Sequence, residues 1–119
     1  MISLIIPCFN EEESLPLFYP EVTSVLQEMN CDYELIFVND GSRDRTLEIL
    51  KELSEKDPHV IYLSFSRNFG KEAAVYAGMA QATGDVVAVM DCDLQHPPET
   101  LISMYHLWEQ GWEVIEGVK

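Results

Sequence analysis

Short apolar runs rich in β-branched residues recur along this chain and alternate with segments of helical periodicity. We expect strands over residues 2–7, 33–38, 60–65, 85–90 and 113–117. Several of these runs are apolar on both faces, which is typical of strands in a parallel sheet that is covered on both sides. The alternation therefore predicts an α/β fold, with an open, mostly parallel, doubly wound sheet and helices on both faces.

Helices are expected between these strands, over about residues 15–29, 46–56 and 71–83 and from residue 97 onward. Pro20, inside the first of them, predicts a kink or a later start. The residues expected to face inward are Leu50 and Leu53 in the second helix, Ala73, Ala77 and Ala80 in the third, and Leu101, Met104, Tyr105 and Trp108 in the fourth.

Composition limits the partners. The chain has 119 residues, which suits one small domain, and a hydrophobic fraction of 47%, which excludes disorder. A net charge of -14 with seven Lys and Arg excludes sequence-independent binding of nucleic acid or anionic lipid. A phosphorylated ligand would need local screening by a cation, most simply a divalent one.

Cys8, Cys31 and Cys92 are odd in number and widely spaced. This pattern favours free thiols in a reducing compartment over a disulfide framework or a zinc site. No apolar run approaches the roughly 18 residues of a membrane span, and no basic region precedes the first apolar stretch. The chain by itself is therefore expected to be soluble and cytosolic.

The loops that follow the predicted strands are strongly polar: "PCFNEEES", "NDGSRDRT", "SRNFGKE" and "DCDLQHPPE". In an open parallel sheet, all four loops lie at the same edge, where such folds bind ligands. We therefore expect a ligand site there.

Asp91 and Asp93 follow the fourth strand, and side chains at positions i and i+2 of extended backbone point the same way. Two convergent carboxylates repel unless a cation lies between them, and oxygen ligands suit Mg²⁺ or Mn²⁺. Gln95 would add a carbonyl oxygen or hold a metal-bound water. On these residues alone, a solvated turn with Asp93 as a helix cap remains an alternative. His96 is expected to be a surface residue.

The first two loops offer further candidates. Asp40 either makes only a turn with Asn39, or accepts hydrogen bonds from a base or a ribose. Asn10 and Glu11 follow the strand that Pro7 ends, and Glu11 lies nearest to the strand. The rest of the "NEEES" run is expected to be a solvated helix N-terminus.

Arg67 and Lys71 bring scarce positive charge to the third loop, beside Asn68 and Gly70. This arrangement suits phosphate oxygens at a helix N-terminus. The segment is not a nucleotide-binding P-loop, because its first glycine and its Ser or Thr are missing.

The segments "VNDGSRDRT", "SRNFGKEAAVYAGMAQATGD" and "VAVMDCDLQHPPE", in this order, resemble the inverting glycosyltransferases of family 2. The branch most similar is the one that loads sugars onto polyprenyl or dolichyl phosphate. The resemblance covers essentially the whole chain. It implies a GT-A type, Rossmann-like nucleotide-binding half and a nucleotide-diphosphate sugar donor.

Carried over by position, the resemblance implies a divalent metal, Mg²⁺ or Mn²⁺, that bridges the donor diphosphate. It would place Pro7, Asn10 and Glu11 in the nucleoside pocket, Asp40 at the base or ribose, Asp91, Asp93 and Gln95 at the metal, and Arg67 and Lys71 at the phosphates or bracing their loop.

Members of this family continue beyond the point where this chain ends, into an Arg-rich acceptor loop and usually into C-terminal membrane helices. We therefore expect residues 1–119 to be a truncated donor-binding part that is incomplete for transfer. The general base or acceptor groups, and the site of the lipid phosphate, would lie beyond Lys119. The parent protein would be membrane-associated with this part on the cytosolic face, and the exposed sheet edge predicts self-association.

Two other classes share some of these features. A phosphoacceptor receiver domain has a similar length, charge and element order, but it needs an acceptor Asp after the third strand, which here ends in "SRN". A metal-dependent nucleotidyltransferase needs a Gly- and Arg-rich loop after the first strand, which "CFNEEES" is not.

Overall fold

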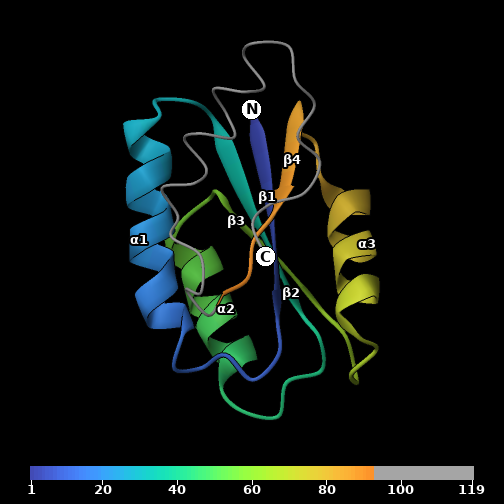
Figure 1. Ribbon diagram of the computed structural model, residues 1–119. Coiled ribbons are helices and arrows are strands. Elements are labelled where there is room, and N and C mark those ends of the chain that lie inside the picture. Colours follow the sequence, from blue (N-terminus) through green and yellow to red (C-terminus); the bar gives the residue numbers. More distant parts are fainter. Residues whose placement is uncertain (93–119) are drawn as a thin grey trace.

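The computed structural model describes residues 1–92, which form a parallel sheet flanked by helices (Figure 1). The elements are β1 (Ile2–Cys8), α1 (Leu15–Glu28), β2 (Tyr33–Asn39), α2 (Thr46–Lys56), β3 (Val60–Ser64), α3 (Lys71–Gln81) and β4 (Val86–Val89). The predicted fourth helix and fifth strand lie outside the described residues. Within residues 1–92, no helix is long and apolar enough to span a membrane.

The sheet confirms the predicted doubly wound fold. Its four strands are all parallel in the order β3-β2-β1-β4, and Ile5 of β1 pairs with Ile36 on one side and Val89 on the other. The chain passes from one edge of the sheet to the opposite edge between β3 and β4. The strand order therefore reverses between β1 and β4, and ligands of open α/β sheets bind at such a reversal, outside the carboxyl ends of the strands.

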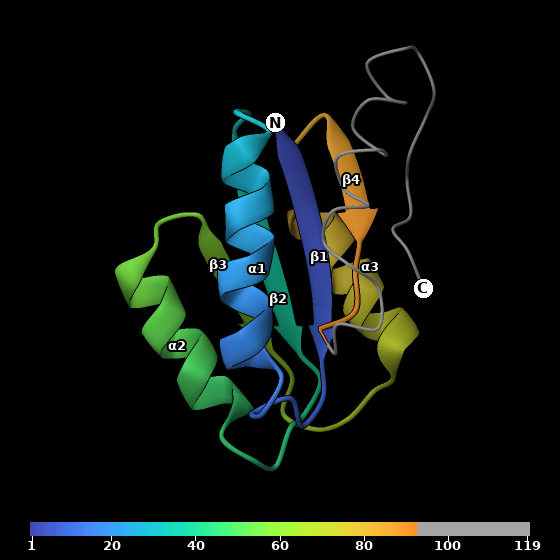
Figure 2. The same cartoon turned by 60° about the vertical axis from the view of Figure 1, so that its left-hand side comes forward.

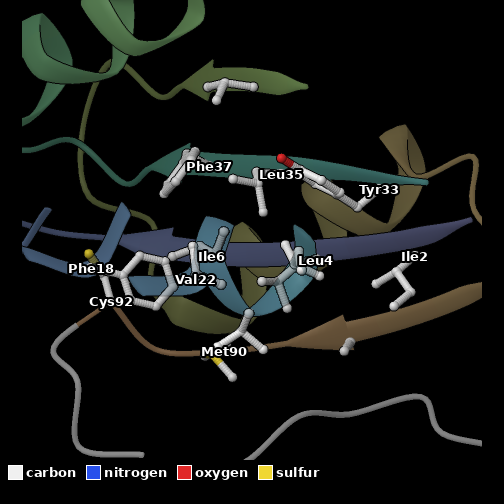
Figure 3. Packing of buried hydrophobic residues seen from close by; sticks show 14 of the residues in the cluster. Ile2, Leu4, Ile6, Phe18, Val22, Tyr33, Leu35, Phe37, Met90 and Cys92 are labelled. Carbon is white, nitrogen blue, oxygen red and sulfur yellow. The ribbon is translucent and has the colours of Figure 1, made fainter. Parts of the chain in front are cut away.

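Helices cover both faces of the sheet (Figure 2). Phe18 of α1 and Leu50 of α2 belong to the main core cluster, whereas Ala74 of α3 packs with Ile36 and Val38 on the other face. Alternate side chains of β1 and β2 enter the main cluster (Figure 3). This two-sided burial explains why the strands read as continuous apolar runs.

The first helix begins at Leu15, so the later start that Pro20 suggested is wrong. Pro20 lies inside α1, and its neighbour Thr23 donates its hydroxyl to the carbonyls of Tyr19 and Pro20, at 2.8 and 3.1 Å. A helix tolerates an internal proline when its apolar face is firmly buried, as that of α1 is.

The predicted inward face of α3 is displaced. Ala80 is exposed, and the buried positions are Ala74 and Gly78. The physical reason is close packing at Gly78, where a Cβ atom would lie 2.5 Å from Cγ2 of Ile5. Because Gly78 faces the sheet, the residue one turn before it, Ala74, is buried as well, and Ala80 is not.

A buried carboxylate joins three elements at the amino end of the sheet. Glu34 of β2 is 8% exposed and accepts hydrogen bonds from the hydroxyl of Ser3 at 2.6 Å and the backbone N–H of Thr83 at 2.8 Å. Ser3 in turn accepts from the N–H of Gly84 at 2.8 Å. The network holds the α3–β4 connection to β1 and β2, and so fixes where β4 begins.

We predict that Glu34→Ala lowers the free energy of unfolding by about 2–3 kcal/mol, because it leaves buried donors without an acceptor. Urea denaturation of the protein measures the change. Glu55→Ala, on the exposed side of α2, is the matched control and should stay within about 0.5 kcal/mol of the parent. Equal effects of the two substitutions would contradict the role given to Glu34.

Candidate functional site

The loops after β1, β2 and β3 gather at the carboxyl end of the sheet (Figure 2). Residues of these loops line two neighbouring hollows. Their volumes are ≈ 350 and ≈ 370 Å³, within the range of small-molecule sites. The first, the acidic hollow, is lined by Pro7, Cys8, Phe9, Glu11, Asp40, Asn68, Gly70, Lys71 and Asp91. The second, the arginine hollow, is lined by Phe9, Asn10, Gly41, Ser42, Arg43, Ser66, Arg67 and Asn68.

Asp40 anchors the loop between β3 and α3. Its side chain is buried, and its carboxylate accepts hydrogen bonds from the N–H of Phe69 at 2.7 Å, the N–H of Gly70 at 3.0 Å and Nδ2 of Asn68 at 3.1 Å. Its own N–H donates to the carbonyl of Cys8 at 2.8 Å. Asp40 therefore joins the ends of β1 and β2 to the start of α3.

Gly41 brings the loop after β2 into contact with the loop after β3. Its φ is +69°, in the region that favours glycine, and a Cβ atom would lie 2.2 Å from the carbonyl carbon of Arg67. Any side chain at position 41 would push the two loops apart. This close approach forms part of the lining of the arginine hollow.

The loop after β1 is held by the loop after β2. Asn10 donates its N–H to the hydroxyl of Ser42 and accepts from the N–H of Arg43, both at 2.9 Å. The N–H of Glu11 donates to the hydroxyl of Thr46 at 2.8 Å. Asn10 has a φ of 54°, a conformation that asparagine adopts more readily than most residues. These bonds place Asn10 and Glu11 at the rims of the two hollows.

Asp44 completes this contact. Its carboxylate accepts from the N–H of Thr46 at 2.9 Å and from the N–H of Glu12 at 3.2 Å. Partial burial opposes ionisation of the carboxyl, but the hydrogen bonds from Thr46 and Glu12 outweigh it and lower its pKa. The charged form is therefore the one that joins the start of α2 to the first loop.

Lys71 and Asp91 meet across the acidic hollow. The Nζ atom of Lys71 lies 2.8 Å from Oδ1 of Asp91, and their side chains are 51% and 25% exposed. Lys71 is the first residue of α3. The N–H of Met90 donates to the carbonyl of Ile5 at 3.0 Å, which extends the pairing of β4 and brings Asp91 out beside the end of β1.

The structure places most of the predicted site residues around these hollows. Pro7, Glu11, Asp40, Lys71 and Asp91 line the acidic hollow, Asn10 and Arg67 line the arginine hollow, and Asp93 and Gln95 lie outside the described residues. Arg67 and Lys71, predicted to act alike, are separated. The guanidinium of Arg67 lies over the ring of Phe69, 4.7 Å from its centroid.

Phe9 is a candidate site residue that the sequence reasoning missed. It lines both hollows and is 45% exposed. The signal was an aromatic residue directly after the strand end in an otherwise polar loop. Exposed aromatic rings beside a cavity offer a flat surface on which a planar ligand can stack.

Cys8, Cys31 and Cys92 form no disulfide, as predicted, and Cys8 and Cys92 are buried. A hydrogen bond with Cys92, together with burial, raises the pKa of the Cys8 thiol well above its usual value. The thiol at the edge of the acidic hollow is therefore protonated at neutral pH, and it is not set up as a nucleophile or a metal ligand.

A hard divalent cation fits the residue that the structure places at the predicted metal position. Asp91 offers oxygen donors and is partly exposed to the acidic hollow, where it already holds the cationic group of Lys71. Residues 1–92 contain no group of three or more His, Cys, Asp or Glu side chains that could hold a metal by themselves. Asp91 would therefore be one ligand among several.

We predict that Asp40→Ala releases the loop after β3. Removal of an acceptor of three hydrogen bonds should cost about 2–4 kcal/mol of stability, and the amides of Phe69 and Gly70 should lose protection from hydrogen exchange. Asp32→Ala, at an exposed position, is the control. Unchanged protection of these two amides would contradict the anchoring role.

We also predict a pH dependence from Asp44. Its pKa is lower in the folded protein than in the unfolded chain, so its stabilisation is present above the usual carboxyl pKa of about 4 and is lost as the pH falls through the folded value. The stability difference between the parent and Asp44→Asn should shrink from pH 6 to pH 3, as measured by urea denaturation. A difference that grows on acidification would refute this.

The family model for glycosyl transferase family 2 matches residues 3–118. Among curated relatives, the glycosyltransferase YkcC of Bacillus subtilis, named as uncharacterized, is 44% identical over 117 residues, covering 98% of this chain and 36% of its own. A prophage bactoprenol glucosyl transferase homolog of Escherichia coli K12 is 44% identical over 114 residues, covering 96% of this chain and 37% of its own. An undecaprenyl-phosphate 4-deoxy-4-formamido-L-arabinose transferase of Photorhabdus laumondii is 40% identical. The match covers 96% of this chain and 35% of that relative. This chain thus spans little more than a third of each relative.

Solved structures share the fold. Residues 1–349 of S. aureus TarS, in complex with UDP, superpose with a TM-score of 0.70 at 24% identity, covering 92% of this chain and 32% of that TarS chain. The mannosyltransferase PcManGT of Pyrobaculum calidifontis, in complex with GDP-Man and Mn²⁺, has a TM-score of 0.69 at 22% identity. The match covers 90% of this chain and 31% of PcManGT. The receiver-domain and nucleotidyltransferase alternatives find no support among these matches. The family match spans nearly the whole chain, and the chain therefore belongs to glycosyl transferase family 2.

Proposed function

We propose that this chain is the donor-binding part of a metal-dependent, inverting glycosyltransferase that transfers a sugar from a nucleotide-diphosphate sugar to a polyprenyl phosphate. The observation that carries the proposal is the acidic hollow, which lies where the strand order reverses and combines the carboxylates of Glu11, Asp40 and Asp91 with the ammonium of Lys71.

The negative charge of the acidic hollow supports the proposal that donor binding depends on a metal. Its described lining carries three carboxylates against one ammonium, and a diphosphate placed there would meet net repulsion. A divalent cation held by Asp91, with Asp93 and Gln95 as further proposed ligands, would reverse the local sign. Binding of the donor should therefore require the cation.

The nucleoside is proposed to lie toward the arginine hollow. Phe9 stands between the two hollows and offers a ring face to a base, with Pro7, Asn10 and Glu11 around it. Asp40 already accepts three hydrogen bonds of the roughly four that a carboxylate can take. It therefore has room for one contact with base or ribose, and its larger role is to hold the loop.

Relatives and neighbours support the donor and acceptor classes. Two relatives carry bactoprenol and undecaprenyl phosphate in their names, and two neighbours were solved with UDP or with GDP-Man and Mn²⁺. By analogy we propose a lipid-phosphate acceptor bound by a region beyond this chain. We propose further that the parent protein is membrane-associated with this part on the cytosolic face. Self-association through an exposed sheet edge stays a prediction.

The proposed reaction is a single displacement. An oxygen of the acceptor phosphate forms a bond to the anomeric carbon from the face opposite the diphosphate, while the bond from that carbon to the diphosphate oxygen breaks, so the configuration inverts. The acceptor is already an anion, so in-line positioning matters more than a strong base. The metal, when bound, would act as a Lewis acid on the leaving diphosphate. Lys71, at the N-terminus of α3, would donate to a phosphate oxygen there.

Calorimetry with uridine and guanosine diphosphate, with and without Mn²⁺, tests the proposal. We expect binding of at least one nucleotide only when Mn²⁺ is present. Asp91→Asn and Asp93→Asn should each abolish this binding. Asp93→Asn should leave the thermal midpoint unchanged or higher, because one of two convergent carboxylates is removed. Asp91→Asn should change the midpoint little, because the ion pair with Lys71 that it loses is open to solvent. Glu55→Gln, on the exposed side of α2, is the control and should bind normally.

Two results would contradict the proposal. The first is metal-independent binding, or no binding of either nucleotide. The second is a large loss of stability in Asp93→Asn, which would indicate that this residue is a structural helix cap.

A further inference from the structure

The ion pair between Lys71 and Asp91 differs from the others in the described part of the chain. Those pairs join the N-terminal amine to Asp85, Arg45 to Glu48, and His59 to Asp57. No partner in these three pairs lines the acidic hollow or the arginine hollow. Lys71 and Asp91 both line the acidic hollow, with Nζ and Oδ1 2.8 Å apart. The pair therefore lies inside the proposed donor site.

Its properties are those of a contact that breaks easily. Half of the Lys71 side chain and a quarter of that of Asp91 are exposed, and ion pairs open to solvent contribute little to folding stability. Lysine carries its charge as a compact group on a flexible four-carbon stem. The ammonium can therefore leave Asp91 without disturbing α3 or β4.

The ion pair also engages the two groups that the proposed reaction needs for binding the metal and the donor. Asp91 is the described carboxylate at the predicted metal position, and Lys71 is the ammonium expected at the donor phosphates. In the structure each of these two groups is the ionic partner of the other. Neither a divalent cation nor a diphosphate gains its full set of contacts until the pair opens.

We propose that Lys71 is a placeholder cation, which neutralises Asp91 in the empty site and moves to the donor diphosphate when a divalent cation takes the carboxylate. The inference rests on the proposed function and adds a coupling to it. A cation that arrives alone must displace Lys71, whereas with a nucleotide present Lys71 gains a new partner. Each ligand therefore strengthens binding of the other by the same factor.

Lys71→Gln tests this, with binding of Mn²⁺ alone measured by electron paramagnetic resonance of the free ion. We expect Mn²⁺ to bind about two- to fivefold more tightly than to the parent, because its competitor is gone. Uridine or guanosine diphosphate, with Mn²⁺ at saturation, should bind about tenfold more weakly, because a charged donor to phosphate is lost. The two effects have opposite signs, which a merely structural role would not produce.

Two further variants serve as controls. Lys51→Gln makes the same charge change at an exposed position of α2 and should alter neither affinity. Lys71→Arg keeps the positive charge and should bind Mn²⁺ alone as weakly as the parent. Matching thermal midpoints would show that all variants are folded.

The outcomes separate this inference from the proposed function. If Lys71→Gln binds Mn²⁺ alone as the parent does, or more weakly, while Mn²⁺-dependent nucleotide binding persists in the parent, the placeholder role is wrong and the donor site stands. If the parent binds neither Mn²⁺ nor nucleotide, the proposed function itself fails.

Discussion

The carboxylate of Asp40 is the contact on which the shape of the site depends. It lies buried at the end of β2 and takes up two backbone N–H groups and one side-chain amide of the loop that leads into α3. A buried carboxylate is costly unless donors surround it, and here they come from a segment about thirty residues away. Satisfying that charge therefore fixes the start of α3, and with it the position of Lys71.

The other loops are fixed in the same way, by polar contacts between segments and not by an apolar core. Asn10 binds the loop after β2 through both its backbone and its side chain, and Asp44 joins the start of α2 to the loop after β1. Gly41 lets the backbone after β2 come close to the backbone at Arg67, beside the arginine hollow. The loops support one another, so the two hollows at the sheet edge are formed by the chain itself.

Much of this was predictable from the sequence because parallel strands bring their carboxyl ends to one edge. Knowing only where the strands end, one expects Pro7, Asp40 and Asp91 to lie near one another, and they line one hollow. What the sequence could not predict were contacts that depend on backbone direction. The donors to Asp40 include N–H groups that carry no residue signature, and Glu34 looks like an ordinary polar residue of a strand until its donors are seen.

The error in predicting the buried face of α3 has a similar cause. Small residues occupy many positions of that helix, so apolar spacing alone did not distinguish Ala80 from Gly78, and the approach to Ile5 decides it. Likewise, the pairing of Lys71 with Asp91 depends on how far α3 and β4 extend toward the hollow. From the sequence, Asp91 is expected at a metal and Lys71 at the donor phosphates. In the structure, the two side chains form an ion pair with each other.

The central claim is that the acidic hollow holds a nucleoside diphosphate through a divalent cation on Asp91. A crystal structure with uridine or guanosine diphosphate and Mn²⁺, with the metal located by its anomalous scattering, tests this most directly. The account predicts a manganese peak beside Asp91, the diphosphate on that ion, and the Lys71 ammonium turned from the carboxylate to a phosphate oxygen. A nucleotide bound elsewhere, or a diphosphate in this hollow with no metal at Asp91, would contradict it.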